Sequence, residues 1–223
     1  MAPLAGKVIG QPLARLIGRV MAGERLADVV PPGTPVPRFV NVKKPVLPFA
    51  RFPGEDALLG PEMKSTGEVM GRGLDFGRAL AEAHLGSGEP LPGSGTVFLS
   101  VRDSGRRAIT FMAKEPVDLG YGRVATRGAA RFLLGDRVPC REVFKVHEGR
   151  PHAADLIENG EIRLVLNTSL GHASEHDERA IRESAVVPGV PAITTVAGAL
   201  AAVSGMQALA RGLLEVLPLQ ETT

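Results

Sequence analysis

Short polar and cationic side chains follow each of five apolar runs in the second half of this 223-residue sequence. They are Ser100 and Arg106 after the first run, Thr126, Arg127 and Gly128 after the second, Lys145 after the third, Asn167, Thr168 and Ser169 after the fourth, and Thr194 and Thr195 after the fifth. A phosphate-binding site typically combines hydroxyl and amide donors, backbone N–H groups at helix N-termini and one or two cations. The pattern therefore predicts a site for a phosphorylated ligand.

The elements around these residues are expected to bring the five ends together. The apolar runs indicate strands over 97–101, 123–125, 141–144, 162–166 and 192–193, alternating with helices over 105–115, 128–134, 151–159, 177–187 and 197–211. This alternation is typical of a doubly wound α/β fold, a parallel sheet of about five strands that binds ligands beyond the strands' carboxyl ends. Pro116 is expected to end the first helix. Alternatively, the Ser and Thr hydroxyls simply cap the following helices, which leaves Lys145 and the 167–169 run unexplained.

The first half of the chain is less regular. Apolar spacing predicts helices over 10–22 and 74–85, and the residues between them contain loops and extended segments interrupted by Pro45 and Pro48. The Gly- and Pro-rich stretch 86–95 (GSGEPLPGSG) is expected to be a linker. The predicted organisation is an irregular α+β tail of a larger domain over 1–85, the linker, and an α/β domain over 96–223.

Other residues that could do chemistry have simpler interpretations. His172 and His176 have the spacing of two zinc ligands on one helix face, but they lie in a polar stretch before a helix. Cys140 has no patterned histidine partner, so a nucleophilic role is not expected. Asp103 and Asp155 fit general bases or capping residues equally well. Gly71, Gly73 and Gly77 lack the spacing of a dinucleotide-binding loop.

Composition narrows the class of protein. The net charge is +2, from 26 basic and 24 acidic side chains, which gives no broad footprint for nucleic acid or a membrane surface. A single cysteine cannot form an internal disulfide, which favours a reducing compartment. The sequence has no apolar run of about 20 residues and no signal-peptide pattern. A cytoplasmic protein is therefore expected.

Two segments resemble carbamoyl-phosphate synthase large subunits. Residues Phe52–Gly71 (FPGEDALLGPEMKSTGEVMG) resemble the end of that family's carbamoyl-phosphate-synthesising ATP-grasp region. Residues Lys145–His152 (KVHEGRPH), with Asn159–Glu161 and then Asn167 and Thr168, resemble its allosteric domain. Both motifs are long, and they occur in the family's order and at about the family's spacing.

The resemblance implies a methylglyoxal-synthase-like fold for roughly residues 94–223, acting as a regulatory domain that binds a nucleoside monophosphate such as UMP or IMP. Matching the motifs gives phosphate-binding roles to Ser100, Thr126, Lys145, Asn167, Thr168 and Ser169, with Arg106 as an added cation. Arg127, Gly128, Thr194 and Thr195 would lie in the effector pocket, and Lys43, Met63 and Glu68 would line a passage for carbamate. The implied partners are the remaining large-subunit domains and a glutaminase small subunit. ATP and Mg²⁺ or Mn²⁺ would serve the parent ligase, with no cofactor and no metal in this chain.

The sequence also departs from the family. Ala129 stands where some regulated members have a Thr, and Lys44 and Ala192 replace a carboxylate and a Tyr of an ornithine-responsive member. Activation by ornithine is therefore not expected. Two alternatives stay open. One is a stand-alone methylglyoxal synthase, although the Asp of those enzymes is missing near Glu148-Gly149-Arg150. The other is a truncated or split-subunit fragment with no activity alone.

Overall fold

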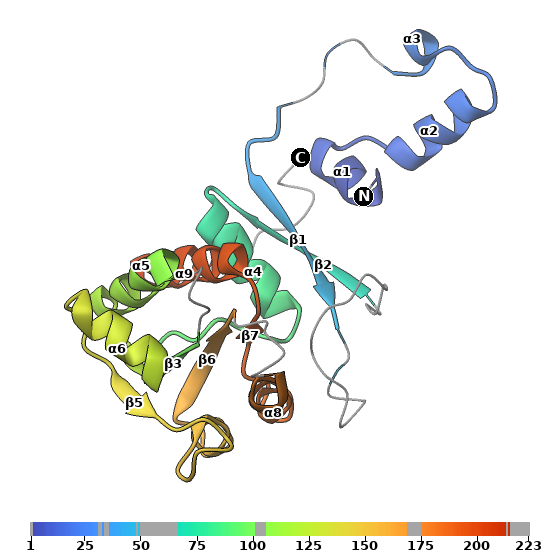
Figure 1. Cartoon of the computed structure of the whole chain (residues 1–223). Helices are drawn as coiled ribbons and strands as arrows, with labels where there is room; N and C mark the ends of the chain where they lie inside the picture. Colours follow the sequence, from blue (N-terminus) through green and yellow to red (C-terminus); the bar gives the residue numbers. More distant parts are fainter. Residues whose placement is uncertain are drawn as a thin grey trace.

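The computed structural model describes residues 2–30, 33, 36–47, 49, 67–100, 106–168, 175–212 and 214. Within these residues the chain forms two sheets, one of five strands and one of two (Figure 1). Helices cover the five-stranded sheet, and the two-stranded hairpin leads away from it to three short helices near the N-terminus.

The larger sheet is parallel throughout and has the order β5-β4-β3-β6-β7. Its strands are β3 (Thr96–Ser100), β4 (Gly122–Thr126), β5 (Arg141–Val143), β6 (Ile162–Asn167) and β7 (Ala192–Ile193). All five strands lie where the apolar runs predict them, and the α/β fold class is confirmed. The chain moves outward from β3 to β5 on one side and from β6 to β7 on the other. The order therefore reverses between β3 and β6, where open α/β sheets place their ligands.

Two layers of helices bury the faces of this sheet. On one face lie α5 (Arg106–Asp118), α6 (Arg127–Gly135) and α9 (Val196–Arg211); on the other lie α7 (Ala153–Glu158) and α8 (Glu175–Val186). Side chains alternate along β3, so Val97 and Leu99 pack with the first group of helices while Phe98 packs with the second. Because both faces are covered, the strands are mainly apolar, and the charged exceptions are Arg123 of β4, Arg163 of β6, and Arg141 and Glu142 of the edge strand β5.

The first of these helices is longer than the sequence predicts. The helix α5 continues to Asp118, with Pro116 inside it, instead of ending before that residue. Proline removes its own N–H donor and its ring crowds the carbonyl four residues earlier, but Pro116 lies in the last turn of α5 and is buried. The burial of this turn outweighs the missing hydrogen bond, so the expectation that Pro116 ends the helix is wrong.

The first half of the chain contains α1 (Ala2–Ile9), α2 (Leu13–Met21), α3 (Leu26–Val29), β1 (Val40–Val46), β2 (Gly67–Gly73) and α4 (Phe76–Gly86). The helices predicted over 10–22 and 74–85 correspond to α2 and α4. The strands β1 and β2 form an antiparallel hairpin, and Pro45 lies inside β1 instead of interrupting it. Both strands are edge strands, where a residue without an N–H group is tolerated.

The helix α4 joins the hairpin to the larger domain, because it packs on β1 and β2 and also on α9 (Figure 1). Its neighbours approach very closely. A Cβ atom on Gly71 of β2 would lie 1.9 Å from the carbonyl oxygen of Ala79, and one on Gly77 of α4 would lie 2.4 Å from that of Ser204. These glycines allow backbones to touch, which is a packing role and not that of a nucleotide loop.

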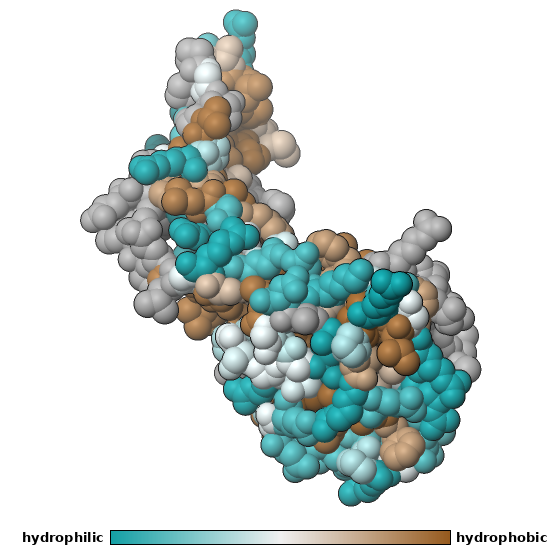
Figure 2. Space-filling view, turned by 90° about the vertical axis from the view of Figure 1, so that its left-hand side faces the viewer, coloured by the Kyte–Doolittle hydropathy of each residue, from teal (hydrophilic) through white to brown (hydrophobic). Residues whose placement is uncertain are grey.

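The three N-terminal helices leave much of their apolar surface uncovered, and Figure 2 shows hydrophobic residues on this projecting part. The helix α2 buries none of its residues, and Ile17, Met21 and Leu26 are 50%, 83% and 63% exposed. In the part of the chain that the structure describes, no helix has both the length and the apolar character needed to cross a bilayer.

Candidate anion site at the carboxyl edge of the sheet

Three of the predicted phosphate-binding residues end adjacent strands of the larger sheet. Ser100 of β3 is in register with Asn167 of β6, and Thr126 ends β4 on the other side of β3. Adjacent strands are about 4.8 Å apart, so the three side chains lie along one short edge. The backbone N–H of Thr168 donates to the carbonyl of Ser100 at 2.9 Å, which fixes the residue after β6 at the same edge.

The amide of Asn167 is the unusual feature of this edge. Asn167 is 1% exposed, and among the residues that the structure describes neither its Oδ1 nor its Nδ2 has a hydrogen-bond partner. The hydroxyl of Thr168 is also buried without a partner. Leaving a buried polar group unsatisfied costs about 1–3 kcal/mol, and nearly all such groups in folded proteins are paired. The two side chains therefore offer donors and an acceptor to a group that binds from outside.

Helix capping accounts for one of the predicted hydroxyls. The Thr195 side chain accepts a hydrogen bond from the N–H of Gly198 at 3.0 Å and so caps α9. Thr126 occupies the same position before α6, but its buried side chain makes no capping bond. Thr126 is thus free to serve a ligand, together with the N–H groups of the first turn of α6.

The predicted cations are placed in different ways. Lys145 follows β5 in a turn, is partly exposed, and its ammonium makes no ion pair with any residue in the described ranges. Arg127 lies at the start of α6 and pairs with Glu142, with 2.9 Å between Nε and Oε1. Arg106 begins α5 at the same edge of the sheet, and its side chain lies outside the described part, as does Ser169.

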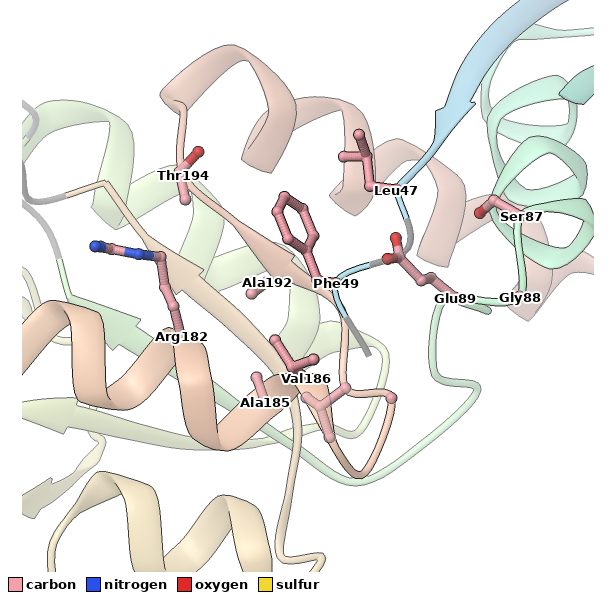
Figure 3. A pocket seen from close by; sticks show the side chains of 12 residues that line it. Leu47, Phe49, Ser87, Gly88, Glu89, Arg182, Ala185, Val186, Ala192 and Thr194 are labelled. Carbon is pink, nitrogen blue, oxygen red and sulfur yellow. The ribbon is translucent and has the colours of Figure 1, made fainter. Parts of the chain in front are cut away.

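The remaining pocket residues differ in their surroundings. Gly128 lies in the first turn of α6, with open space where a Cβ would stand. Thr194 instead lines a separate cavity of about 270 Å³ between the end of the hairpin and α8 (Figure 3). Leu47 and Phe49 form one wall of this cavity, and Val186 forms another. Thr194 also directly follows β7, whose Ile193 is in register with Leu166, the residue before Asn167.

The residues assigned to a carbamate passage lie on the hairpin. Lys43 of β1 and Glu68 of β2 form an ion pair across the two strands. Met63 lies outside the described residues. A cross-strand ion pair on an exposed hairpin contributes at most about 1 kcal/mol to stability, so the structure gives this pair a modest local role.

The structure describes three of the remaining candidate residues, Cys140, Asp155 and His176. Burial raises the pKa of the Cys140 thiol, which keeps it protonated and weakly nucleophilic near neutral pH. Asp155 accepts from the backbone N–H of His152 in a capping box at the start of α7. His176 is exposed, and His172 and Asp103 lie outside the described residues. No cluster of metal-ligating side chains is present among the residues that the structure describes.

One contact beside Lys145 is absent from the sequence expectations. The ring Nδ1 of His147 lies 2.5 Å from Oδ2 of Asp177, and the backbone N–H of His147 donates to Oδ1 at 3.1 Å. The sequence places Asp177 only at a helix start, because nothing in a spacing of 30 residues indicates that the two side chains meet.

Comparison with known proteins relates the sequence of this chain to a family. The MGS-like domain family matches residues 108–194, which include the ends of β4, β5, β6 and β7. Over 98% of its length the chain is 44% identical to the carbamoyl phosphate synthase large chain of Nostoc sp. and 45% identical to that of Mesorhizobium japonicum. It is homologous to the C-terminal part of carbamoyl phosphate synthase large chains. An arginine-specific, chloroplastic large chain of Arabidopsis thaliana is 44% identical over 98% of this chain.

The chain spans about a fifth of the length of these large chains, 20% in Nostoc sp., 19% in Mesorhizobium japonicum and 18% in Arabidopsis thaliana. The resemblance inferred from the two motifs is thus confirmed at the level of the family, and the parallel sheet agrees with an MGS-like domain. The roles of individual residues at the sheet edge, and the division into domains, stay predictions.

Proposed function

We propose that this chain is a regulatory module of carbamoyl phosphate synthase that binds a nucleoside monophosphate, such as UMP or IMP, through its phosphate. The buried and unpartnered polar atoms of Asn167 and Thr168 carry the proposal. They lie where the strand order reverses, beside Ser100, Thr126 and the N-terminus of α6. A phosphate group supplies acceptors for the amide and hydroxyl donors, and Lys145 supplies the opposite charge.

Regulation requires that the effector bind two states of the whole synthase with different affinity. The chain holds the elements for such a link, because α4 packs on the hairpin and on α9 of the larger domain. The close approach of the backbones at Gly71 and Gly77 packs α4 tightly against both the hairpin and α9. A movement of the α/β domain is therefore passed to the hairpin.

The exposed apolar side chains of α2 and α3 support a further part of the proposal, that the rest of a synthase large chain is the partner. An amphipathic helix that buries nothing gains stability only by packing on another surface. Substituting Ile17 by Asp is expected to abolish association with the separately produced upstream region of the Nostoc large chain. Association that is equal in the variant and the original chain would contradict this assignment.

The effector site is tested by calorimetric titration of the purified chain with UMP, IMP, uridine and inorganic phosphate. We expect binding that requires the phosphate. Hydrogen bonds to charged groups contribute about 1.5–3 kcal/mol, so Lys145→Ala is expected to weaken UMP binding roughly 10- to 150-fold. Lys114→Ala, at an exposed lysine two turns along α5, serves as the matched control and is expected to bind normally.

Two results would contradict the effector site. One is equal affinity for UMP and uridine, which would mean that the phosphate is not recognised. The other is formation of methylglyoxal from dihydroxyacetone phosphate, which would favour the phosphate-eliminating enzyme over the regulatory module.

A further inference from the structure

The turn that carries Lys145 is closed by its own residues. The backbone N–H of Lys145 donates to Oε2 of Glu148 at 2.9 Å, and the N–H of Glu148 donates to the carbonyl of Lys145 at 3.0 Å. These two bonds fix the shape of the turn. They do not fix its position relative to the sheet, because Glu148 is itself exposed.

A second attachment does fix that position. Asp177 of α8 accepts from the backbone N–H of His147 with one carboxylate oxygen and contacts the ring of His147 with the other. The Asp177 side chain is only 7% exposed, whereas that of His147 is 65% exposed. Hydrogen bonds to a carboxylate are stronger than those between neutral groups, and a buried carboxylate needs them. The buried Asp177 carboxylate thus fixes the position of the exposed His147.

The helix that carries Asp177 is anchored to the same strand as Asn167. Ile181 and Ala185 of α8 belong to the buried cluster that includes Val165 of β6. The position of Asp177 is therefore set by the strand whose last residue is Asn167. Through Asp177, the turn of Lys145 is held at a defined place relative to the unpartnered amide.

From this geometry we infer that Asp177 is a positioning residue of the anion site, which holds the Lys145 turn through His147 so that the Lys145 ammonium is in place before the phosphate arrives. This inference rests on the proposed function, because it concerns the same site. Preorganisation removes the entropy cost of ordering the lysine turn on binding. Contacting residues typically couple by a factor of about 2 to 150, and we expect roughly tenfold weaker UMP binding without the carboxylate.

A simpler role for Asp177 predicts a different result. As an acidic residue in the first turn of α8, it also stabilises the helix through its negative charge. The variant Asp177→Asn removes the charge, but its side-chain oxygen still accepts from the N–H of His147 and its NH₂ group can donate to Nδ1. Positioning is kept in Asp177→Asn and lost in Asp177→Ala, whereas the contribution of the charge to α8 is lost in both.

The experiment is calorimetric titration of the chain with UMP, comparing the original sequence with Asp177→Asn, Asp177→Ala, Lys145→Ala and the double variant. We expect near-normal binding in Asp177→Asn, about tenfold weaker binding in Asp177→Ala, and no further weakening when Asp177→Ala is added to Lys145→Ala. Equal losses in the Asn and Ala variants, or a tenfold loss that persists without Lys145, would overturn the inference.

Circular dichroism of Asp177→Ala and, where needed, titration of His147→Ala distinguish a folding defect from a binding defect. If Asp177→Ala fails to fold by circular dichroism, His147→Ala replaces it, because this substitution at an exposed position removes the contact between the His147 ring and Oδ2 of Asp177. Its UMP binding is then expected to weaken measurably, and unchanged binding would contradict the inference. A chain that binds no UMP, or binds equally without Lys145, contradicts the proposed function itself. UMP binding that requires Lys145 but is unchanged by substitution of Asp177 contradicts only the positioning role.

Discussion

Replacing Asn167 by Leu separates two effects of the unpartnered amide: the stability that it costs the unliganded chain and the stabilisation that it allows when UMP binds. Leucine has a similar branched shape and no polar atoms, so the variant removes the two unsatisfied groups of Asn167 from a position that is 1% exposed. The backbone pairing of β6 with β3 does not depend on this side chain. A buried unsatisfied group costs about 1–3 kcal/mol, so we expect the unliganded variant to be more stable than the original chain by that amount.

The expected change is large enough to measure by thermal unfolding. For a chain of 150–250 residues, each kcal/mol raises Tm by about 2–4 °C, which predicts an increase of roughly 2–12 °C without ligand. In contrast, UMP at 100 times its Kd stabilises the original chain by about 2.7 kcal/mol. We expect most of this ligand-induced shift to disappear in Asn167→Leu, because the amide contacts are lost.

The difference in Tm between the two chains should therefore shrink or reverse as UMP is added, because about 2.7 kcal/mol of ligand stabilisation is comparable with the initial difference of about 1–3 kcal/mol. A matched control is Leu166→Asn, which places an amide on the preceding, fully buried residue of β6 and should destabilise the chain under both conditions. The reasoning is refuted if Asn167→Leu melts below the original chain without ligand, or if UMP raises the Tm of both equally.

Three other perturbations test the fold around the site. Thr195→Ala removes the cap of α9 and is expected to lower the free energy of unfolding by about 1 kcal/mol, measured by urea denaturation. Gly71→Ala places a Cβ 1.9 Å from the Ala79 carbonyl oxygen and should lower the free energy of unfolding by about 1–3 kcal/mol or more in the same assay. The control Gly67→Ala, on the same strand, meets only ordinary contacts and should lower it far less. Burial lowers the pKa of His84 below its ordinary value of 6.5, so the unfolded chain binds a proton more readily than the folded one, and stability present above pH 6.5 is lost as the pH falls below it. His84→Gln should flatten the decrease in the urea midpoint between pH 7.5 and 5.5, and an unchanged slope would contradict this cause.

The sequence predicts the larger sheet well because its central strands are rich in apolar residues and have polar residues at their carboxyl ends. The end of β6 shows this most clearly, since Leu164, Val165 and Leu166 are fully buried and the next residue is Asn167. The same reasoning misses β2, whose glycines at 67, 71 and 73 give no apolar period. Gly71 and Gly73 are explained by the helix α4 packed against them, which is a contact between segments that the local pattern does not reveal.

Hydroxyl residues at strand ends show the other limit of sequence reasoning. Thr126 and Thr195 both precede helices in the same way, yet only Thr195 caps its helix. The difference depends on the orientation of one side chain, which the residue type does not determine. The contact of His147 with Asp177 is likewise invisible in the sequence, because it depends on how α8 packs on β6.

The central claim is that the unpartnered amide of Asn167 receives the phosphate of a nucleotide, and it is tested most directly by NMR titration of the side-chain amide groups. The resonance pair of Asn167 is assigned by its disappearance in Asn167→Leu. The account predicts that this pair shifts saturably with UMP and with inorganic phosphate, and does not shift with uridine. Saturable UMP binding that leaves the Asn167 amide resonances unmoved would contradict it.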